Sequence, residues 1–230
     1  MREKPDEIRG QRRGPHREVN RRYLIICEGE TEKAYFDFVK KSLNSKTIVI
    51  MSMTGSSSDQ VAVAKEAIKR GMPDTSTGVS GYDEVWAVFD WDEKTDRVEQ
   101  AKKMLRDAKK TARSKNCKTQ FHVALSNPLF EVWYLWHLTD YGVTGCSKND
   151  VLTALKKQCP RYEKGKIPPG VEGHYIDASR RARKAVESHK REGRVFPEDR
   201  PRSDIAALMG SIVASWCKFR GLSQKDTLPI

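Results

Sequence analysis

Over its first 140 residues the chain alternates short strand-like runs with amphipathic helical patterns. Residues 23–27, 46–51, 85–89 and 121–125 form these runs, and each has the length of a single strand. A run that stays apolar without polar alternation is typical of a strand buried on both faces of its sheet. Strands separated by helices favour right-handed crossover connections between parallel neighbours. We therefore expect an α/β fold with a mostly parallel sheet flanked by helices.

Three regions differ in character along the chain. Residues 1–21 are rich in Arg, contain two Pro and two Gly, and lack hydrophobic periodicity, which is typical of a flexible basic arm. Residues 22–140 contain the alternating pattern. In residues 141–230 strand-like runs vanish and helical patterns appear at residues 151–157, 179–190 and 204–219. This predicts a helical C-terminal part packed on the α/β domain.

One further helix is predicted to begin at Pro128, because proline is favoured at the first helical position. Its residues Phe130, Trp133, Tyr134 and Trp136 are aromatic, and aromatic rings are able to stack on exposed bases. Their helical spacing among Leu and Val favours the other interpretation, a buried core element.

The formal net charge of +12 favours a polyanionic partner such as nucleic acid. Lys and Arg exceed acidic residues in residues 94–118 and again in residues 177–202. Within the second stretch, Arg180, Arg181, Arg183 and Lys184 are candidates for contacts with a nucleic-acid backbone. A solvated helix face explains the same four residues equally well.

Cysteine, histidine and hydropathy patterns exclude several classes of protein. The five Cys are scattered and form no CxxC pair, and no HExxH motif occurs, so we expect neither a disulfide framework nor a zinc site. No apolar run approaches membrane-spanning length, and no secretory signal precedes the first strand. We therefore expect a soluble, cytoplasmic protein with no membrane association.

Acidic residues follow two of the predicted strands at the point where each ends. Glu28 comes directly after the first strand, and Asp90 and Asp92 come directly after the third. Ligands of open α/β sheets bind at the carboxyl edge, where these side chains converge if the two strands are neighbours. Several carboxylates in one small volume suit Mg²⁺ or Mn²⁺. Taken singly, each acid is more commonly a turn former or helix cap.

These motifs resemble the RloB family and, more broadly, the Toprim signature of primases, topoisomerases and OLD-type nucleases. The resemblance rests on the Glu-Gly-Glu-Thr-Glu sequence that ends residues 24–32, on residues 82–93 with their Asp-Trp-Asp, and on residues 126–133. A looser likeness surrounds residues 162–165, and the whole runs from about residue 22 to about residue 215. The basic arm lies outside it.

The resemblance implies a Toprim, Rossmann-like nuclease domain that depends on Mg²⁺ or Mn²⁺. It also implies a role in bacterial anti-phage defence with an AAA/ABC-type ATPase as partner. By the same resemblance Glu28, Asp90 and Asp92 hold metal, and Glu32 and Glu131 complete a second metal position. Ser126 would lie nearby. OLD-type enzymes place this Ser and Glu closer together, so capping of the following helix is the alternative role for Ser126.

Neutralisation of a scissile phosphate calls for a basic residue, and Lys164 and Lys166 flank a glycine that would let their loop approach a backbone. Plain surface lysines are the alternative for both. Three functions remain open at this point, namely a nuclease acting on DNA or RNA, a non-catalytic binding or sensor subunit of an ATPase complex, and a primase-like nucleotidyl transferase. Any of them is compatible with a homo-oligomer.

Overall fold

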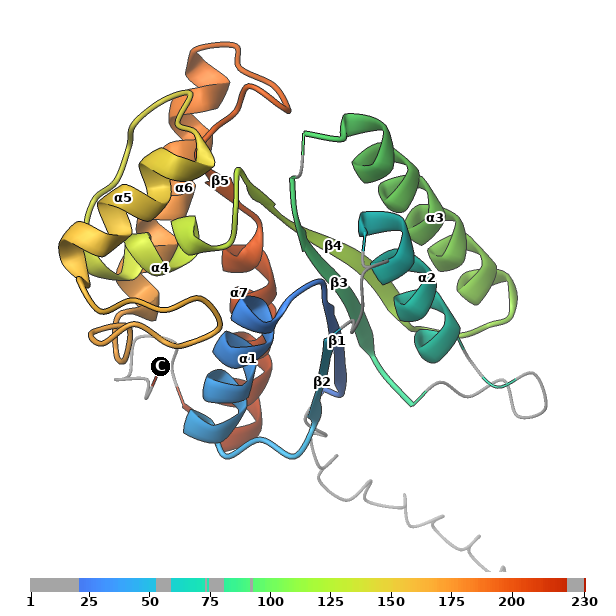
Figure 1. The fold of residues 1–230 in the computed structure, drawn as a ribbon. Coiled ribbons are helices and arrows are strands. Elements are labelled where there is room, and N and C mark those ends of the chain that lie inside the picture. The colour runs from blue at the N-terminus through green and yellow to red at the C-terminus, as the bar shows by residue number, and fades with distance from the viewer. Residues whose placement is uncertain (1–20, 53–58, 73, 75–80, 92, 223–229) are drawn as a thin grey trace, which may run out of the picture.

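The computed structural model describes residues 21–52, 59–72, 74, 81–91, 93–222 and 230. Helices and strands alternate through the first half of the chain, and helices dominate the second half (Figure 1). In chain order the elements are β1 Tyr23–Cys27, α1 Glu30–Ser42, β2 Ile48–Ser52, α2 Gln60–Gly71, β3 Glu84–Asp90, α3 Thr95–Ser114, β4 Gln120–Asn127, α4 Glu131–Leu138, α5 Lys148–Gln158, α6 Tyr175–Arg191, β5 Arg202–Ser203 and α7 Ile205–Arg220.

The strands form one sheet in the order β2-β1-β3-β4-β5. The first four strands are parallel, and β5 pairs with β4 in the antiparallel direction. The predicted α/β class and its mostly parallel sheet are therefore confirmed. β1 and β3 are neighbours, with Cys27 opposite Val88, so the residues that follow both strands emerge at the same edge.

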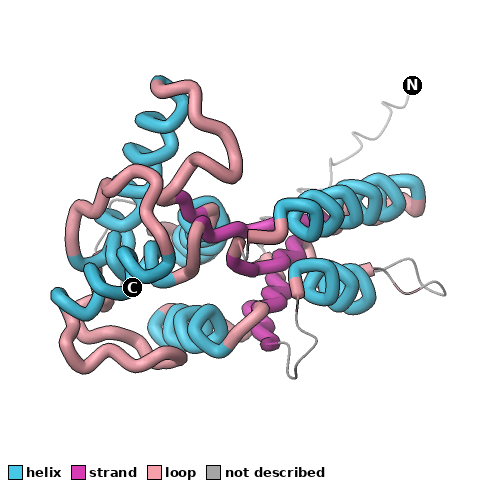
Figure 2. Tube along the Cα trace, turned by 45° about the horizontal axis from the view of Figure 1, so that its top comes forward, coloured by secondary structure: helices cyan, strands magenta, loops and turns pink. Residues whose placement is uncertain are grey.

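Both faces of the sheet are covered by helices, as the uniformly apolar strands predicted. Leu24 and Ile26 of β1 pack toward α2 and α3, whereas Ile25 and Cys27 pack toward the opposite layer. That opposite layer holds α1 and α7 against the sheet, and α4, α5 and α6 lie farther out (Figures 1 and 2). Residues 141–230 thus contribute a strand to the sheet and a helix to one of its faces, besides the outer helices.

The predicted helix start at Pro128 is wrong, because β4 continues through Asn127 and α4 begins at Glu131. Ser126 pairs with Asp90 of β3 on one side and with Ser203 of β5 on the other. Sheet pairing on both sides therefore keeps this segment extended, which is also the conformation favoured for a residue before proline. Ser126 is consequently a strand residue, not a helix cap.

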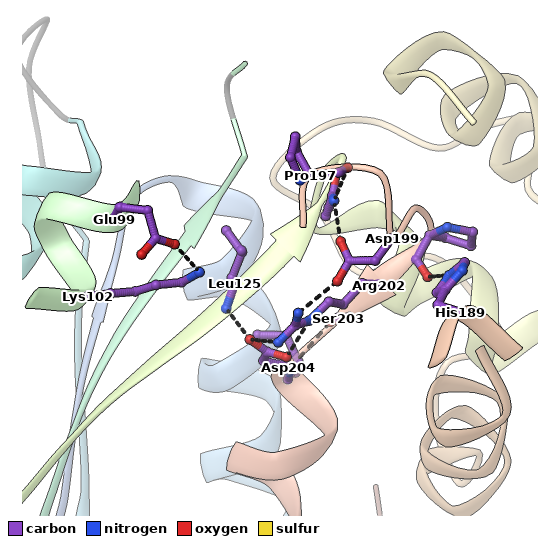
Figure 3. Close-up of polar contacts among 12 residues, drawn as sticks. Glu99, Lys102, Leu125, His189, Pro197, Asp199, Arg202, Ser203 and Asp204 are labelled. Atoms are coloured by element: carbon purple, nitrogen blue, oxygen red, sulfur yellow. Dashed lines mark hydrogen bonds and ion pairs between the residues drawn. The ribbon is translucent and has the colours of Figure 1, made fainter. Parts of the chain in front are cut away.

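A cluster of polar side chains stabilises the short strand β5 beside the end of β4 (Figure 3). The guanidinium of Arg202 donates to Asp199 at 2.8 Å and to Asp204 at 3.0 Å, and Asp204 accepts from the backbone N–H of Leu125 at 3.4 Å. A strand of two residues has no apolar run that could be recognised in the sequence. For this reason β5 was not predicted.

The aromatic helix α4 is buried, as its spacing predicted. Trp133, Tyr134 and Trp136 have no exposed surface, and His137 retains 2%. These rings therefore belong to the core and are not available to stack on bases. All five Cys side chains are buried, and none forms a disulfide with another. None of the helices in the described residues is long and apolar enough to cross a membrane.

Two predictions from the sequence fall on residues outside the described set. The basic arm, residues 1–21, is described only at Arg21, and Asp92 is not described. The metal-binding role predicted for Asp92 therefore stays a prediction.

Candidate functional site

One cavity of about 390 Å³ gathers four of the predicted acidic residues, Glu28, Glu32, Asp90 and Glu131, together with Lys164. It opens at the carboxyl ends of β1 and β3, the edge that the sequence pattern indicated. Two neighbouring strands and two helix starts supply its acidic groups. Its lining residues are Glu28, Gly29, Thr31, Glu32, Asp90, Leu129, Glu131, Lys148, Leu152 and Lys164.

Four carboxylates of the described residues reach the cavity from four separate places in the chain. Glu28 follows β1 directly, and Asp90 is the last residue of β3. Glu32 lies in the first turn of α1, and Glu131 is the first residue of α4. The positive end of a helix dipole favours negative charge in the first turn, so these two helices help to accommodate their acids.

Gly29, which follows Glu28 in the chain, leaves room for the side chain of Glu32. A Cβ atom added at this position would lie 3.0 Å from Oε2 of Glu32. A larger residue would therefore require the Glu32 carboxylate to shift by a few tenths of an ångström. This contact gives a physical reason for the Glu-Gly pair that the sequence resemblance singled out.

Hydrogen bonds orient two of the carboxylates and leave a third incompletely satisfied. The backbone N–H of Asp90 donates to Oε2 of Glu28 at 3.1 Å, and the Tyr162 hydroxyl donates to Oε1 of Glu131 at 2.9 Å. Oδ1 of Asp90 is buried and accepts no hydrogen bond from the described residues. A buried carboxylate oxygen without a partner raises the free energy of the folded state, and a bound cation or a protonated neighbour would lower it.

The pKa values of two carboxyl groups in the cavity are also raised. Burial raises the pKa of Glu32 to about 7, a backbone hydrogen bond partly offsets this rise, Glu28 and Glu131 raise the pKa further, and Lys164 lowers it slightly. Burial, followed by repulsion from Glu32, Glu131 and Glu28, raises the pKa of Asp90 well above its ordinary value. Among the described residues, four carboxylates thus share the cavity with two lysines, Lys148 and Lys164.

The donor set fits a hard divalent cation. Among the described residues, no three Asp, Glu, His or Cys side chains lie close enough together to hold one ion between them. Mg²⁺ commonly binds through only one or two carboxylates and keeps several waters. Four carboxylates around a cavity of this size, one with a partnerless buried oxygen, suit binding of that kind.

A loop after α5 carries Lys164 into the cavity. The backbone N–H of Gly165 donates to Oγ1 of Thr31 at 3.1 Å, which ties the loop to the start of α1. Lys166 lies outside the cavity lining and forms an ion pair with Glu163 at 2.6 Å. The structure therefore brings Lys164, but not Lys166, to the acidic groups.

Gly165→Ala should destabilise the protein by about 1–2 kcal/mol, because Gly165 has φ +80°, a conformation unfavourable for any residue with a Cβ atom. Urea unfolding followed by circular dichroism would measure the change. Gly142→Ala is the matched control, since Gly142 has no positive φ and open space around its Cα. Equal stability of the two variants would contradict the strained-loop explanation.

The basic residues predicted on α6 do not join this cavity. Arg181 donates to the backbone oxygens of Trp136 and His137 and so closes the end of α4. Its neighbours stay on the outer surface, where Arg180 pairs with Asp177, Lys184 pairs with Asp140, and Arg183 donates to the Ser179 carbonyl. The role in nucleic-acid contact predicted for them stays a prediction.

Ser126 does not line the cavity, and it stands opposite Asp90 in the β3–β4 register. Its hydroxyl is buried and has no partner among the described residues. Sequence analysis missed two residues of the site, Lys148 in the cavity wall and Tyr162, which orients Glu131. Ser147 and Asp150 form a capping box, a sequence signal that marks the start of α5 but assigns no role to Lys148.

Comparison with known proteins gives one match. Residues 23–212 match the family model described as RloB-like protein. No curated protein and no solved structure matches the chain. The matched span includes every residue that lines the acidic cavity.

Proposed function

The chain belongs to the RloB-like family, and from this premise we propose that it is a divalent-metal-dependent nuclease with a Toprim-type domain. It would hydrolyse phosphodiester bonds of DNA or RNA with Mg²⁺ or Mn²⁺. The observation that carries the proposal is the convergence of Glu28, Glu32, Asp90 and Glu131 on one cavity at the carboxyl edge of the sheet. A bound divalent ion supplies charge stabilisation for the phosphate and lowers the pKa of water.

Under this proposal the residues that line the cavity have different roles around the bound ion. Asp90 and Glu28 would hold it at the strand ends, where the backbone N–H of Asp90 fixes the Glu28 carboxylate. Glu131, oriented by Tyr162, and Glu32 would supply a second position or hold ordered water. Lys164 would face the scissile phosphate, since it is brought into the cavity by the loop that Thr31 anchors.

We extend the proposal to anti-phage defence and to an AAA/ABC-type ATPase partner. Support for this part comes from the sequence motifs that resemble the Toprim nucleases of defence systems, in residues 24–32, 82–93 and 126–133. Cleavage gated by such a partner would keep the nuclease harmless to the cell until infection.

A second candidate function is a non-catalytic subunit that binds nucleic acid or senses it for an ATPase. One observation favours it, since no three acidic side chains of the described residues lie close enough together to share an ion. The two functions differ in a simple way, because only the nuclease needs a charged carboxylate at Glu28.

Glu28→Gln should abolish metal-dependent cleavage by the protein. The assay would incubate wild type and variant with Mg²⁺, Mn²⁺ or EDTA on supercoiled DNA, single-stranded DNA and bulk tRNA, first alone and then with an AAA/ABC-type ATPase as the proposed partner. Glu30→Gln is the matched control, because Glu30 is an exposed glutamate two residues away that does not line the cavity.

Cleavage by wild type and Glu30→Gln but not by Glu28→Gln would support the nuclease and identify its substrate class. Full cleavage by Glu28→Gln would exclude the proposed site. Binding without cleavage on every substrate, with the ATPase present, would favour the non-catalytic subunit.

A further inference from the structure

A second cavity, of about 220 Å³, adjoins the acidic one. Lys148 lines both cavities, so they meet at the start of α5. In contrast to the first cavity, the second is bordered, among the described residues, by two basic side chains and a single acidic one. Its lining residues are Trp91, Glu93, Pro128, Ser147, Lys148, Asn149 and Arg200.

Arg200 is held in place, and it forms no ion pair with a carboxylate of the described residues. Its guanidinium carbon lies 5.2 Å from the centre of the Trp91 ring, an arrangement typical of a cation–π contact. Nε of Arg200 is buried, and the atom has no hydrogen-bond partner among the described residues. Arginine is the residue best suited to phosphate, because its planar group presents several donors in a fixed geometry.

The backbone on either side of Arg200 is anchored. Its carbonyl accepts from the N–H of Gly145 at 3.0 Å. The preceding Asp199 is buried and accepts from the Asn127 side chain at 2.9 Å and from Arg202 at 2.8 Å (Figure 3). These contacts fix the loop against β4, so Arg200 is preorganised at the cavity wall.

The start of α5 faces the same cavity. This helix has 11 residues and a capping box in which Ser147 and Asp150 satisfy each other's backbone N–H groups. Ser147, Lys148 and Asn149 line the cavity, so the positive end of the helix adds to the charge of Lys148 and Arg200. Glu93 opposes this charge at the cavity wall, and Asp150 opposes it within the first turn of the helix.

We propose that this second cavity binds a backbone phosphate of the nucleic acid, next to the phosphodiester positioned in the acidic cavity. Trp91 is only 8% exposed and Arg200 lies over its ring, so the site suits a phosphate and not a stacked base. The inference rests on the proposed function for its substrate class. Under this proposal Lys148 lies between the phosphate that is cleaved and the adjacent backbone phosphate.

Equilibrium binding tests this site independently of cleavage. The probes are a labelled single-stranded DNA and a labelled RNA of equal length, measured by fluorescence anisotropy in EDTA over a series of NaCl concentrations. Arg200→Gln should weaken binding roughly tenfold at low salt, as expected for loss of a charged hydrogen-bonding group. The slope of log K against log [NaCl] should fall by about 0.7, the value for one phosphate contact on a single strand.

Arg194→Gln is the matched control, because Arg194 lies on the same loop, pairs with Glu192 at 2.7 Å and does not line the cavity. An unchanged slope in Arg200→Gln, or an equal fall in Arg194→Gln, would overturn the inference. Thermal melting checks the fold of each variant. If Arg200→Gln is unfolded, Asn149→Asp decides, because it places a negative charge in the second cavity and not in the acidic one and should weaken binding at low salt.

The two proposals fail in distinguishable ways. A slope that falls in Arg200→Gln while wild type cleaves nothing would support the phosphate site and count against the nuclease. Cleavage by wild type with an unchanged KM in Arg200→Gln would leave the nuclease in place and remove the phosphate site.

Discussion

Asp90→Asn is expected to abolish metal-dependent cleavage and, at the same time, to stabilise the metal-free protein. The Asp90 carboxylate is surrounded by Glu32, Glu131 and Glu28, and burial and this repulsion raise its pKa well above the ordinary value. Its Oδ1 has no hydrogen-bond partner among the described residues. Asparagine keeps the shape and removes the charge, so it relieves the repulsion while losing an anionic oxygen ligand.

The expected sizes make the two effects easy to separate. Cleavage should fall by at least about 10²-fold, the scale found when one preorganised electrostatic group is removed from an active site. The melting temperature in EDTA at neutral pH should rise by about 2–4 °C for each kcal/mol of relieved repulsion in a chain of this size. Cleavage assays and differential scanning calorimetry on the same samples would measure both.

Asp96→Asn is the control, since Asp96 is exposed in the first turn of α3 and lies outside the cavity. It should change neither quantity appreciably. Loss of activity together with a lower melting temperature would mean that Asp90 supports the fold, not the chemistry. Retained cleavage in Asp90→Asn would remove the metal site from the mechanism.

The sequence predicted the sheet because its strands are apolar at almost every position. Residues 23–27 and 85–89 need cover on both faces, and an alternating order of strands and helices supplies it. Adjacency of these two strands was only a condition of the argument, and the β1–β3 pairing fulfils it. Once they are adjacent, Glu28 and Asp90 have to meet at one edge.

Contacts between segments that are distant in the chain could not be predicted from the sequence. The predicted helix start at Pro128 failed because β5, about 75 positions later, extends the pairing of β4. The capping box beside Lys148 and the loose family likeness around Tyr162 assign no role to either residue, and only the packing of α5 and its following loop brings them to Glu131 and its cavity. Local patterns predict elements well, whereas site residues on separate elements depend on how these elements pack.

The metal-free protein is expected to lose stability as the pH rises from about 4.5 to about 7. Burial, then repulsion from Glu28 and Glu131, raises the pKa of Glu32 from 4.5 to about 7 in the folded protein. Between these values the folded state binds more protons than the unfolded state, so the free energy of unfolding falls as pH increases. Below this window Glu32 is protonated in both states, and above it the full penalty of the buried charge remains. The raised pKa of Asp90 acts in the same direction.

Mg²⁺ should restore this stability, and its effect should grow with pH, because metal ions bind the ionised carboxylates and stabilise only the folded state. Urea unfolding at about pH 5 and about pH 8, in EDTA and in excess Mg²⁺, measures both dependences. Glu32→Gln should flatten the pH dependence in EDTA, whereas Glu30→Gln, which changes an exposed glutamate of the same turn, should not. Stabilisation by Mg²⁺ that is equal at both pH values would mean that the ion binds elsewhere. In that case the raised pKa of Glu32 would reflect only the cost of burying a carboxylate in the fold.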